Sequence, residues 1–149
     1  EKLSSFITTE QAGGSAESLG RIGTLPAPVA IDAFAHSVCK RLGVSHVRLV
    51  RAADRPVRRV AVVGGAGAEF IDTAVRRGAD VYITGDVKYH EAQRAVEQGM
   101  HLIDAGHFGT ERPVLPVLAD LLRAELAAEH GTVEILVTEK QRDVFDVIL

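Results

Sequence analysis

Short apolar runs alternate along the chain with longer segments in which apolar residues recur every three or four positions. The runs at 58–63, 81–83 and 100–103 are mostly apolar, as expected for strands covered on both faces. The segments between them have helical spacing and end at Gly78 and Gly99, residues suited to a helix C-terminus. Because parallel strands need a crossover connection, the alternation predicts a layered α/β fold with a largely parallel sheet and helices on both faces.

Weaker patterns predict the flanking elements. Residues 1–18 are rich in Ser, Thr, Gly and Glu without a sustained period, so they are interpreted as a linker or loosely held arm with at most a short strand. Residues 19–149 form one domain by length. Within this domain, we expect an extended segment at 20–25, strands at 44–50 and 133–137, and helices at 32–42, 69–77, 86–98 and 110–129.

Composition narrows the class of protein. The 149 residues are 46% hydrophobic with a formal net charge of −3, so the chain can bury a core and lacks the basic surface expected for direct nucleic-acid binding. The single cysteine, Cys39, excludes an internal disulfide and favours a reducing compartment, so a cytoplasmic location is expected. No apolar run reaches the roughly 18 residues of a membrane span, so no membrane partner is expected.

A glycine-rich stretch, Gly64-Gly-Ala-Gly67, follows the first apolar run. Free backbone N–H groups in such a turn can hold a phosphate. The dinucleotide fingerprint G-x-G-x-x-G is incomplete, because Phe70 stands where its third glycine would be. A tight turn between strand and helix is therefore favoured over a nucleotide-cofactor site.

Two polar clusters follow the next two apolar runs. They are Thr84-Gly-Asp-Val-Lys-Tyr-His90 and Asp104-Ala-Gly-His-Phe-Gly-Thr-Glu111. Because the carboxyl ends of parallel strands meet at one edge of a sheet, where ligands bind, the two clusters predict one site.

The second cluster holds two metal-ligand residue types, His107 and Glu111, four positions apart. One helical turn brings such residues within reach of one ion, and imidazole with carboxylate suits zinc, manganese or iron. The alternative is that Glu111 stabilises a helix start and His107 is a hydrogen-bonded loop residue. A tetrahedral site also needs further ligands from elsewhere.

The first cluster supplies Asp86, Lys88 and His90 as candidate catalytic residues. Asp86 and His90 at the rim of the crevice could act as acid or base, or orient a ligand. The alternative is that Asp86 is the N-cap of the following helix, with Lys88 and His90 facing solvent.

Three stretches in order, at 60–67, 79–90 and 104–111, resemble the carboxyl-terminal half of the Ngg-interacting-factor-three-like family. Its bacterial members are dinuclear-metal-centre proteins, often labelled GTP cyclohydrolase type-two homologues. Residues 19–26 and 133–145 fit the same half, so the resemblance covers about residues 19–149. It implies one half of a two-half fold, in which His107 and Glu111 match the family's G-H-x-x-x-E metal ligands.

The resemblance also implies partners. In the family a missing amino-terminal half supplies a His-His pair and an Asp to the site, and no His-His pair occurs in this sequence. The intact protein would hold two divalent ions, whereas this chain alone is expected to bind metal weakly or not at all. Family members form ring-like hexamers, so a homo-oligomer is expected.

These features imply a metal-dependent function. The expected reaction is metal-assisted hydrolysis, of the cyclohydrolase or phosphoesterase type, with the substrate left open. Glu111 would bridge the ions and His107 would bind one of them, with Asp86, Lys88 and His90 lining the pocket. The alternatives are a metal-binding scaffold without turnover, or a regulatory interaction protein.

Overall fold

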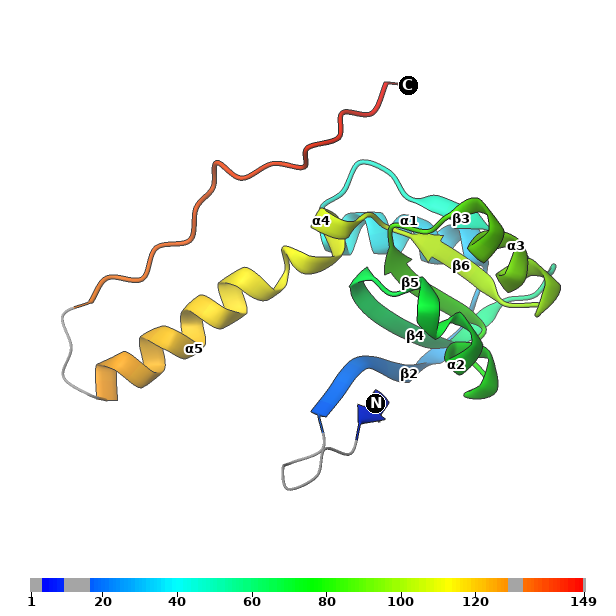
Figure 1. The fold of residues 1–149 in the computed structure, drawn as a ribbon, viewed down its shortest axis with the longest axis horizontal. Coiled ribbons are helices and arrows are strands. Elements are labelled where there is room, and N and C mark those ends of the chain that lie inside the picture. The colour runs from blue at the N-terminus through cyan, green and yellow to red at the C-terminus, as the bar shows by residue number, and fades with distance from the viewer. Residues whose placement is uncertain (1–3, 10–16, 129–132, 149) are drawn as a thin grey trace.

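A six-stranded sheet forms the centre of the computed structural model, which describes residues 4–9, 17–128 and 133–148 (Figure 1). In spatial order the strands are β1 (Ser4–Thr9), β2 (Glu17–Val29), β4 (Val57–Ala66), β5 (Val81–Gly85), β6 (His101–Asp104) and β3 (Arg48–Val50). The three central strands β4, β5 and β6 run parallel. The pairings β1–β2, β2–β4 and β3–β6 are antiparallel, so the predicted parallel sheet is confirmed at its centre and has antiparallel flanks.

The helices cover both faces of this sheet, as predicted. The elements are α1 (Ile31–Leu42), the short 3-10 helix η1 (Ala68–Phe70), α2 (Ile71–Arg76), α3 (Tyr89–Glu97), α4 (His107–Glu111) and α5 (Val114–Ala128). Helices α2 and α3 are the crossover connections β4–α2–β5 and β5–α3–β6 that parallel pairing requires.

Two buried clusters fix the layers. On one face, Phe34 and Val38 of α1 pack with Val81 and Ile103 of the central strands. The opposite face buries side chains of α2 and α3 against the same strands: Ile71, Ala74, Ala95, Tyr82 and Leu102. Alternate residues of one strand therefore face different helices, which is why these runs are apolar at almost every position.

One buried polar group lies within the second cluster. The hydroxyl of Tyr82 donates a hydrogen bond of 2.8 Å to the carbonyl of Gly67. Burial raises the pKa of Tyr82 above its usual value, so the phenol stays neutral and keeps this bond. The bond ties the middle of β5 to the turn that follows β4.

Several predicted boundaries were wrong, and proline explains one of them. The expected helix at 110–129 is divided into α4, which begins at His107, and α5. Pro113 lies between them and has no N–H to donate to the carbonyl four residues earlier, so the helical ladder breaks there. The prediction for residue 129 lies outside the described residues.

Two predictions about the ends of the chain also differ from the structure. Residues 4–9 of the expected arm form β1 and pair with β2, so they belong to the sheet, whereas residues 1–3 and 10–16 lie outside the described residues. The strand expected at 133–137 is absent. A strand needs a neighbour for its backbone groups, and this segment instead runs back along α5, away from the sheet (Figure 1). The expected strand at 44–50 is reduced to β3.

Candidate metal centre

The two polar clusters meet where the parallel strands end. Strand β5 ends at Gly85, directly before Asp86, and β6 ends at Asp104, two residues before α4 begins. Strand β4 reaches Ala66, so Gly64 and Gly65 lie on the strand rather than in a turn after it. Residues of the two polar clusters therefore lie together at the carboxyl edge of the sheet.

His107 lies at the centre of this cluster, between two carboxylates. Its Nδ1 is 2.7 Å from Oδ2 of Asp86, and its Nε2 is 3.1 Å from Oε1 of Glu111. All three side chains are about half exposed. The imidazole and carboxylate predicted to converge thus do so, with Asp86 holding the far side of the ring.

A left-handed backbone turn places Asp86. Its φ is 56°, and among the described residues it is the only non-glycine residue with a positive φ. The helix N-cap is Lys88, so the alternative interpretation of Asp86 as the N-cap was wrong. This conformation costs on the order of 1 kcal/mol, and aspartate is one of the few residues that tolerate it. Such strain next to His107 is typical of a functional position.

Asp104 supports this arrangement from below. Its buried carboxylate accepts hydrogen bonds from the backbone N–H groups of Val87 (3.1 Å) and Gly106 (3.0 Å). It also forms an ion pair with Arg48 of the edge strand β3. Asp104 therefore fixes the backbone on both sides of the cluster, after Asp86 and before His107. The sequence offered one signal for this role, a carboxylate at the last position of an apolar strand.

Gly65 provides the floor beneath the donor atoms. Its φ is 66°, and a Cβ at this position would lie 2.5 Å from Oε1 of Glu111 and 3.3 Å from Nε2 of His107. Its N–H donates to Oγ1 of Thr110 at 2.8 Å, and its carbonyl accepts from Oγ1 of Thr84 at 3.0 Å. Thr84 and Thr110 thus hold the backbone of Gly65, the residue that leaves room for the donor atoms. The sequence did not reveal this role of Gly65.

The negative charges of Asp86 and Glu111 favour a positive charge on or beside the imidazole of His107. The hydrogen bond with Asp86 raises the pKa of His107 above its usual value, and the charge of Glu111 adds to the effect. When Nδ1–H donates to Asp86, the lone pair on Nε2 faces Glu111. A proton on Nε2, or a metal ion between Nε2 and Glu111, removes that repulsion.

The donor set fits part of a metal site. Adjacent ligands about 2.1 Å from an ion are roughly 3.0–3.4 Å apart in octahedral or tetrahedral geometry, and the two donor atoms here are 3.1 Å apart. A carboxylate on the other ring nitrogen is the usual way to orient a metal-binding histidine. Across the part of the chain that the structure describes, no group of three or more His, Cys, Asp or Glu residues is arranged to hold an ion. The residues therefore fit an incomplete site.

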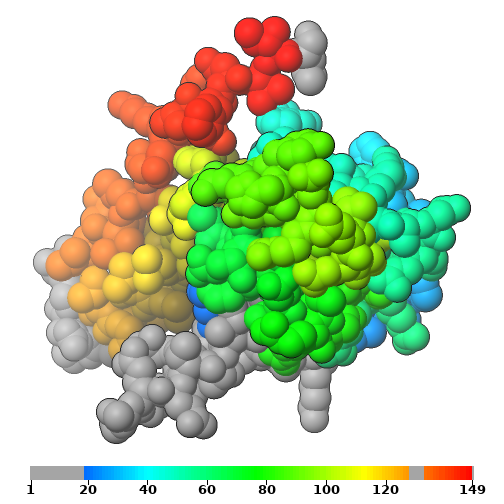
Figure 2. Space-filling model, turned by 45° about the vertical axis from the view of Figure 1, so that its right-hand side comes forward, coloured from blue at the N-terminus to red at the C-terminus, as the bar shows by residue number. Residues whose placement is uncertain are grey.

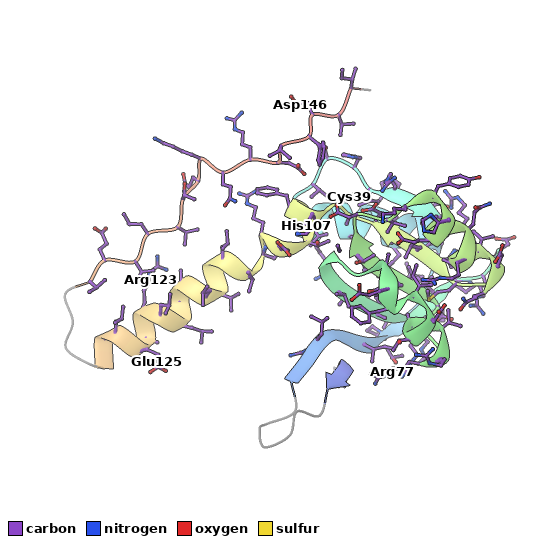
Figure 3. All side chains as sticks on the ribbon, in the orientation of Figure 1. Cys39, Arg77, His107, Arg123, Glu125 and Asp146 are labelled. Atoms are coloured by element: carbon purple, nitrogen blue, oxygen red, sulfur yellow. The ribbon has the colours of Figure 1, made fainter. Side chains whose placement is uncertain are left out.

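The other two predicted catalytic residues lie apart from this cluster. Lys88 and His90 are exposed at the start of α3 and are absent from the lining of the groove beside His107. That groove has a volume of about 1590 Å³ and is walled by α4, residues 42–48 and residues 141–147. His107 is one of the residues that line this groove, and it is the first residue of α4 (Figure 3). A catalytic role for Lys88 and His90 stays a prediction.

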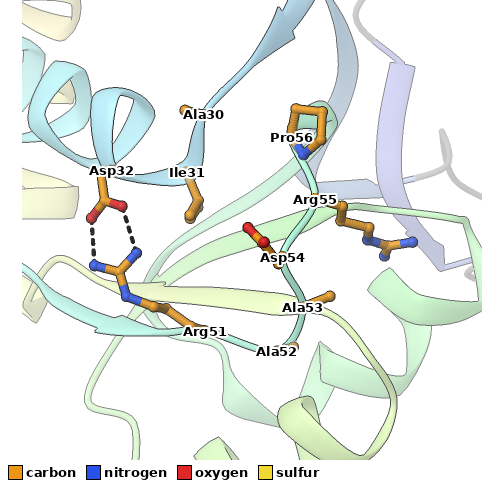
Figure 4. Close-up of a pocket in the computed structure, with 9 residues that line it drawn as sticks. All are labelled: Ala30, Ile31, Asp32, Arg51, Ala52, Ala53, Asp54, Arg55 and Pro56. Atoms are coloured by element: carbon orange, nitrogen blue, oxygen red, sulfur yellow. Dashed lines mark hydrogen bonds and ion pairs between the residues drawn. The ribbon is translucent and has the colours of Figure 1, made fainter.

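A second, smaller pocket lies at the opposite edge of the sheet, before β4 begins (Figure 4). It has a volume of about 570 Å³ and is lined by residues 30–32 and 51–56. Arg51 donates two hydrogen bonds to the carboxylate of Asp32 at its mouth, which lowers the pKa of that carboxyl. Arg51 and Asp32 thus satisfy each other, and none of the predicted site residues lines this pocket.

The fold and the side-chain cluster define an α/β protein with an imidazole between two carboxylates at the carboxyl edge of its sheet. The family described as Duf34/NIF3 (NGG1p interacting factor 3) matches residues 2–144. The chain belongs to this family, which confirms the resemblance drawn from its three motifs.

Similar proteins extend well beyond the matched part. A GTP cyclohydrolase 1 type 2 homolog of Bacillus subtilis is 45% identical over 62% of this chain and 25% of its own length. The homolog of Halalkalibacterium halodurans is 33% identical over 91% of this chain and 36% of its length. The crystal structure of a Bacillus cereus protein related to NIF3 superposes with a TM-score of 0.85 at 35% identity, over 91% of this chain and 37% of that one. The chain thus spans about a third of the length of such relatives.

Proposed function

We propose that this chain contributes His107 and Glu111 to a dinuclear divalent-metal site. The observation that carries the proposal is the line Asp86–His107–Glu111, with contacts of 2.7 and 3.1 Å. In this line Asp86 accepts the Nδ1 proton and so directs Nε2 towards the oxygen of Glu111. Zinc, manganese and iron suit this pair of donors.

The remaining ligands would come from a partner half. Two donors are too few for a stable site, and the relatives contain further polypeptide that this chain does not match. The groove beside His107 opens the donor atoms to such a partner. This chain alone is then expected to bind metal weakly, and the complete site would form only between halves.

The reaction we propose is metal-assisted hydrolysis of a nucleotide or phosphoester, in keeping with the name of the relatives. Two bound divalent ions supply an activated water and polarise the bond under attack. Within this chain, His107 and Glu111 would hold the ions, and Asp86 would keep the imidazole in the required tautomer. Asp104 and Gly65 hold these groups in place through the backbone.

Metal binding is tested by calorimetry with zinc and manganese on the chain and on its complex with a partner half. His107→Ala and Glu111→Gln are expected to abolish the site, whereas the control His90→Ala leaves it unchanged. Equal binding by wild type and His107→Ala would refute the assignment.

Turnover is tested on the metal-loaded complex with GTP and a phosphodiester, with and without chelator. Hydrolysis that stops on chelation supports the enzyme. Metal binding without turnover would favour the non-catalytic scaffold instead.

A further inference from the structure

A second pair of side chains lies beside the two donors on α4. Phe108 and Arg112 are four positions apart, as His107 and Glu111 are. The guanidinium carbon of Arg112 lies 5.9 Å from the centre of the Phe108 ring. One step along a helix turns the side chain by about 100°, so this pair lies on the strip next to the donors. All four residues line the same groove.

The guanidinium of Arg112 keeps its hydrogen-bond donors available. Arg112 is exposed, and within the described part of the chain its side chain contacts the Phe108 ring but forms no hydrogen bond or ion pair. Arg48, which lines the same groove, is instead occupied by the carboxylate of Asp104 and the carbonyl of Val87. A guanidinium carries five N–H donors, so Arg112 presents a charged group with unused donors next to the candidate metal ligands.

The packing of α4 fixes the place of this cation. A Cβ on Gly109 would lie 2.6 Å from Cγ1 of Val44, so glycine allows α4 to lie close against the segment before β3. The backbone N–H of Arg112 donates to the carbonyl of Phe108 at 3.0 Å, which continues the helical geometry by one residue. Because the half-buried ring of Phe108 supports one face of the guanidinium, Arg112 has less freedom to lose when it binds a ligand.

The charge and shape of Arg112 suit an oxyanion. A planar guanidinium binds phosphate with two parallel hydrogen bonds, and arginine next to divalent ions is a common way to hold a phosphoryl group. The yellow part of the chain, which contains α4, lies at the surface in Figure 2, between the green body and the orange to red residues 133–148. A ligand can therefore reach this strip of α4 from solvent.

We propose that Arg112, supported by the Phe108 ring, binds a phosphate group of the substrate on which the metal site acts. The inference rests on the proposed function and narrows its substrates to molecules that carry a phosphate close to the bond that is hydrolysed. Arg112 thus contacts the substrate and determines specificity, without holding an ion. The ordinary alternative is a surface arginine that only stacks on the residue one turn earlier, and it predicts no effect on substrate affinity.

The first test needs no metal. The chain, in buffer freed of metal by a chelating resin, is titrated with pyrophosphate by calorimetry. We expect weak binding that Arg112→Ala reduces about tenfold. Arg112→Lys should restore only part of it, because lysine keeps the charge but lacks the planar fork. The control Arg76→Ala, at an exposed arginine of α2 outside the groove, should bind as the wild type does.

The second test uses the metal-loaded complex with a partner half and GTP as the substrate. Arg112→Ala is expected to raise KM about tenfold with little change in kcat, since it removes a contact made in the ground state and the transition state alike. Metal affinity should stay at the wild-type value, because Arg112 holds no ion. Absence of metal binding by the wild type would overturn the proposed function, whereas pyrophosphate binding that ignores Arg112→Ala would overturn this inference alone.

Two further results would overturn the assignment of Arg112 to a phosphate. One is a loss of pyrophosphate affinity in Arg142→Ala in place of Arg112→Ala, which would move the anion to the wall formed by residues 141–147. The other is malonate binding as tightly as pyrophosphate with the same dependence on Arg112, which would assign the guanidinium to a carboxylate. Because Arg112 is exposed, its variants are expected to fold as the wild type does, which circular dichroism checks.

Discussion

Replacing Gly65 with alanine tests whether the floor of the site controls its donor atoms. The new Cβ would lie 2.5 Å from Oε1 of Glu111 and 3.3 Å from Nε2 of His107. The first distance is far below van der Waals contact, so the carboxylate must swing away. Because Glu111 is a flexible side chain, this displacement costs little folding energy but removes the alignment of the two donors.

The expected magnitudes separate these two effects. An alanine at a φ near 66° costs roughly 1–2 kcal/mol of stability, and each kcal/mol lowers Tm by about 2–4 °C in a chain of this length. Gly43 is a matched control, because its φ is 67° and no atom lies within 4 Å of its Cβ position. Gly43→Ala and Gly65→Ala should therefore lose similar stability, and only Gly65→Ala should disturb the site.

Two assays measure the disturbance. In metal-free protein, NMR titration should show the pKa of His107 closer to its usual value in Gly65→Ala, because the contribution of Glu111 is reduced, and unchanged in Gly43→Ala. In the complex with a partner half, calorimetry should show metal affinity reduced about 10–100-fold for Gly65→Ala alone. A Gly65→Ala protein with the wild-type pKa of His107 and wild-type metal affinity would refute the reasoning.

Three further predictions concern single groups. Asp86→Asn removes the negative charge that faces Nδ1 of His107. NMR titration should then show a lower pKa for the imidazole, and calorimetry should show a metal affinity reduced about 10–100-fold. Protons compete with metal for Nε2, so affinity should decline as the pH falls through the raised pKa of His107, at a higher pH than for an ordinary histidine; a flat competition titration would contradict this. Leu102→Ala opens a cavity under α2 and α3 and should cost about 2–5 kcal/mol in urea denaturation, whereas the exposed Val96→Ala should change stability by less than about 0.5 kcal/mol.

The central layers could be predicted from sequence because each face of each strand is buried. Val81, Leu102 and Ile103 are all fully covered, and that requirement is visible in the sequence as short runs that are mostly apolar. The antiparallel flanks could not be predicted in this way, since β1 and β2 carry no distinct period and their pairing is set by contacts distant in sequence. The break at Pro113 was not predicted, because one continuous helix was expected at 110–129.

The candidate site also combines contacts that local sequence geometry sets with contacts that only the tertiary fold sets. His107 and Glu111 are four positions apart, so local helical geometry alone brings them together. Asp86 reaches His107 only because its own backbone is left-handed, and Gly65 lies beside Glu111 only because α4 packs against the end of β4. Neither relation has a sequence period. The strand predicted at 133–137 fails for a related reason, because pairing depends on a sheet edge that the described residues do not offer it.

The sealed phenol of Tyr82 has a practical consequence. The chain holds two tyrosines and no tryptophan, so at alkaline pH the absorbance on the long-wavelength side of the aromatic band comes from tyrosinate alone. Tyr89 has 79% of its surface exposed, whereas Tyr82 is fully enclosed. After a jump to alkaline pH, the tyrosinate absorbance should therefore rise in two stages. The first comes from Tyr89, and the second comes from Tyr82 when β5 separates from its neighbours. The delay between the stages would time the opening of the sheet directly below the His107 cluster, without any added label.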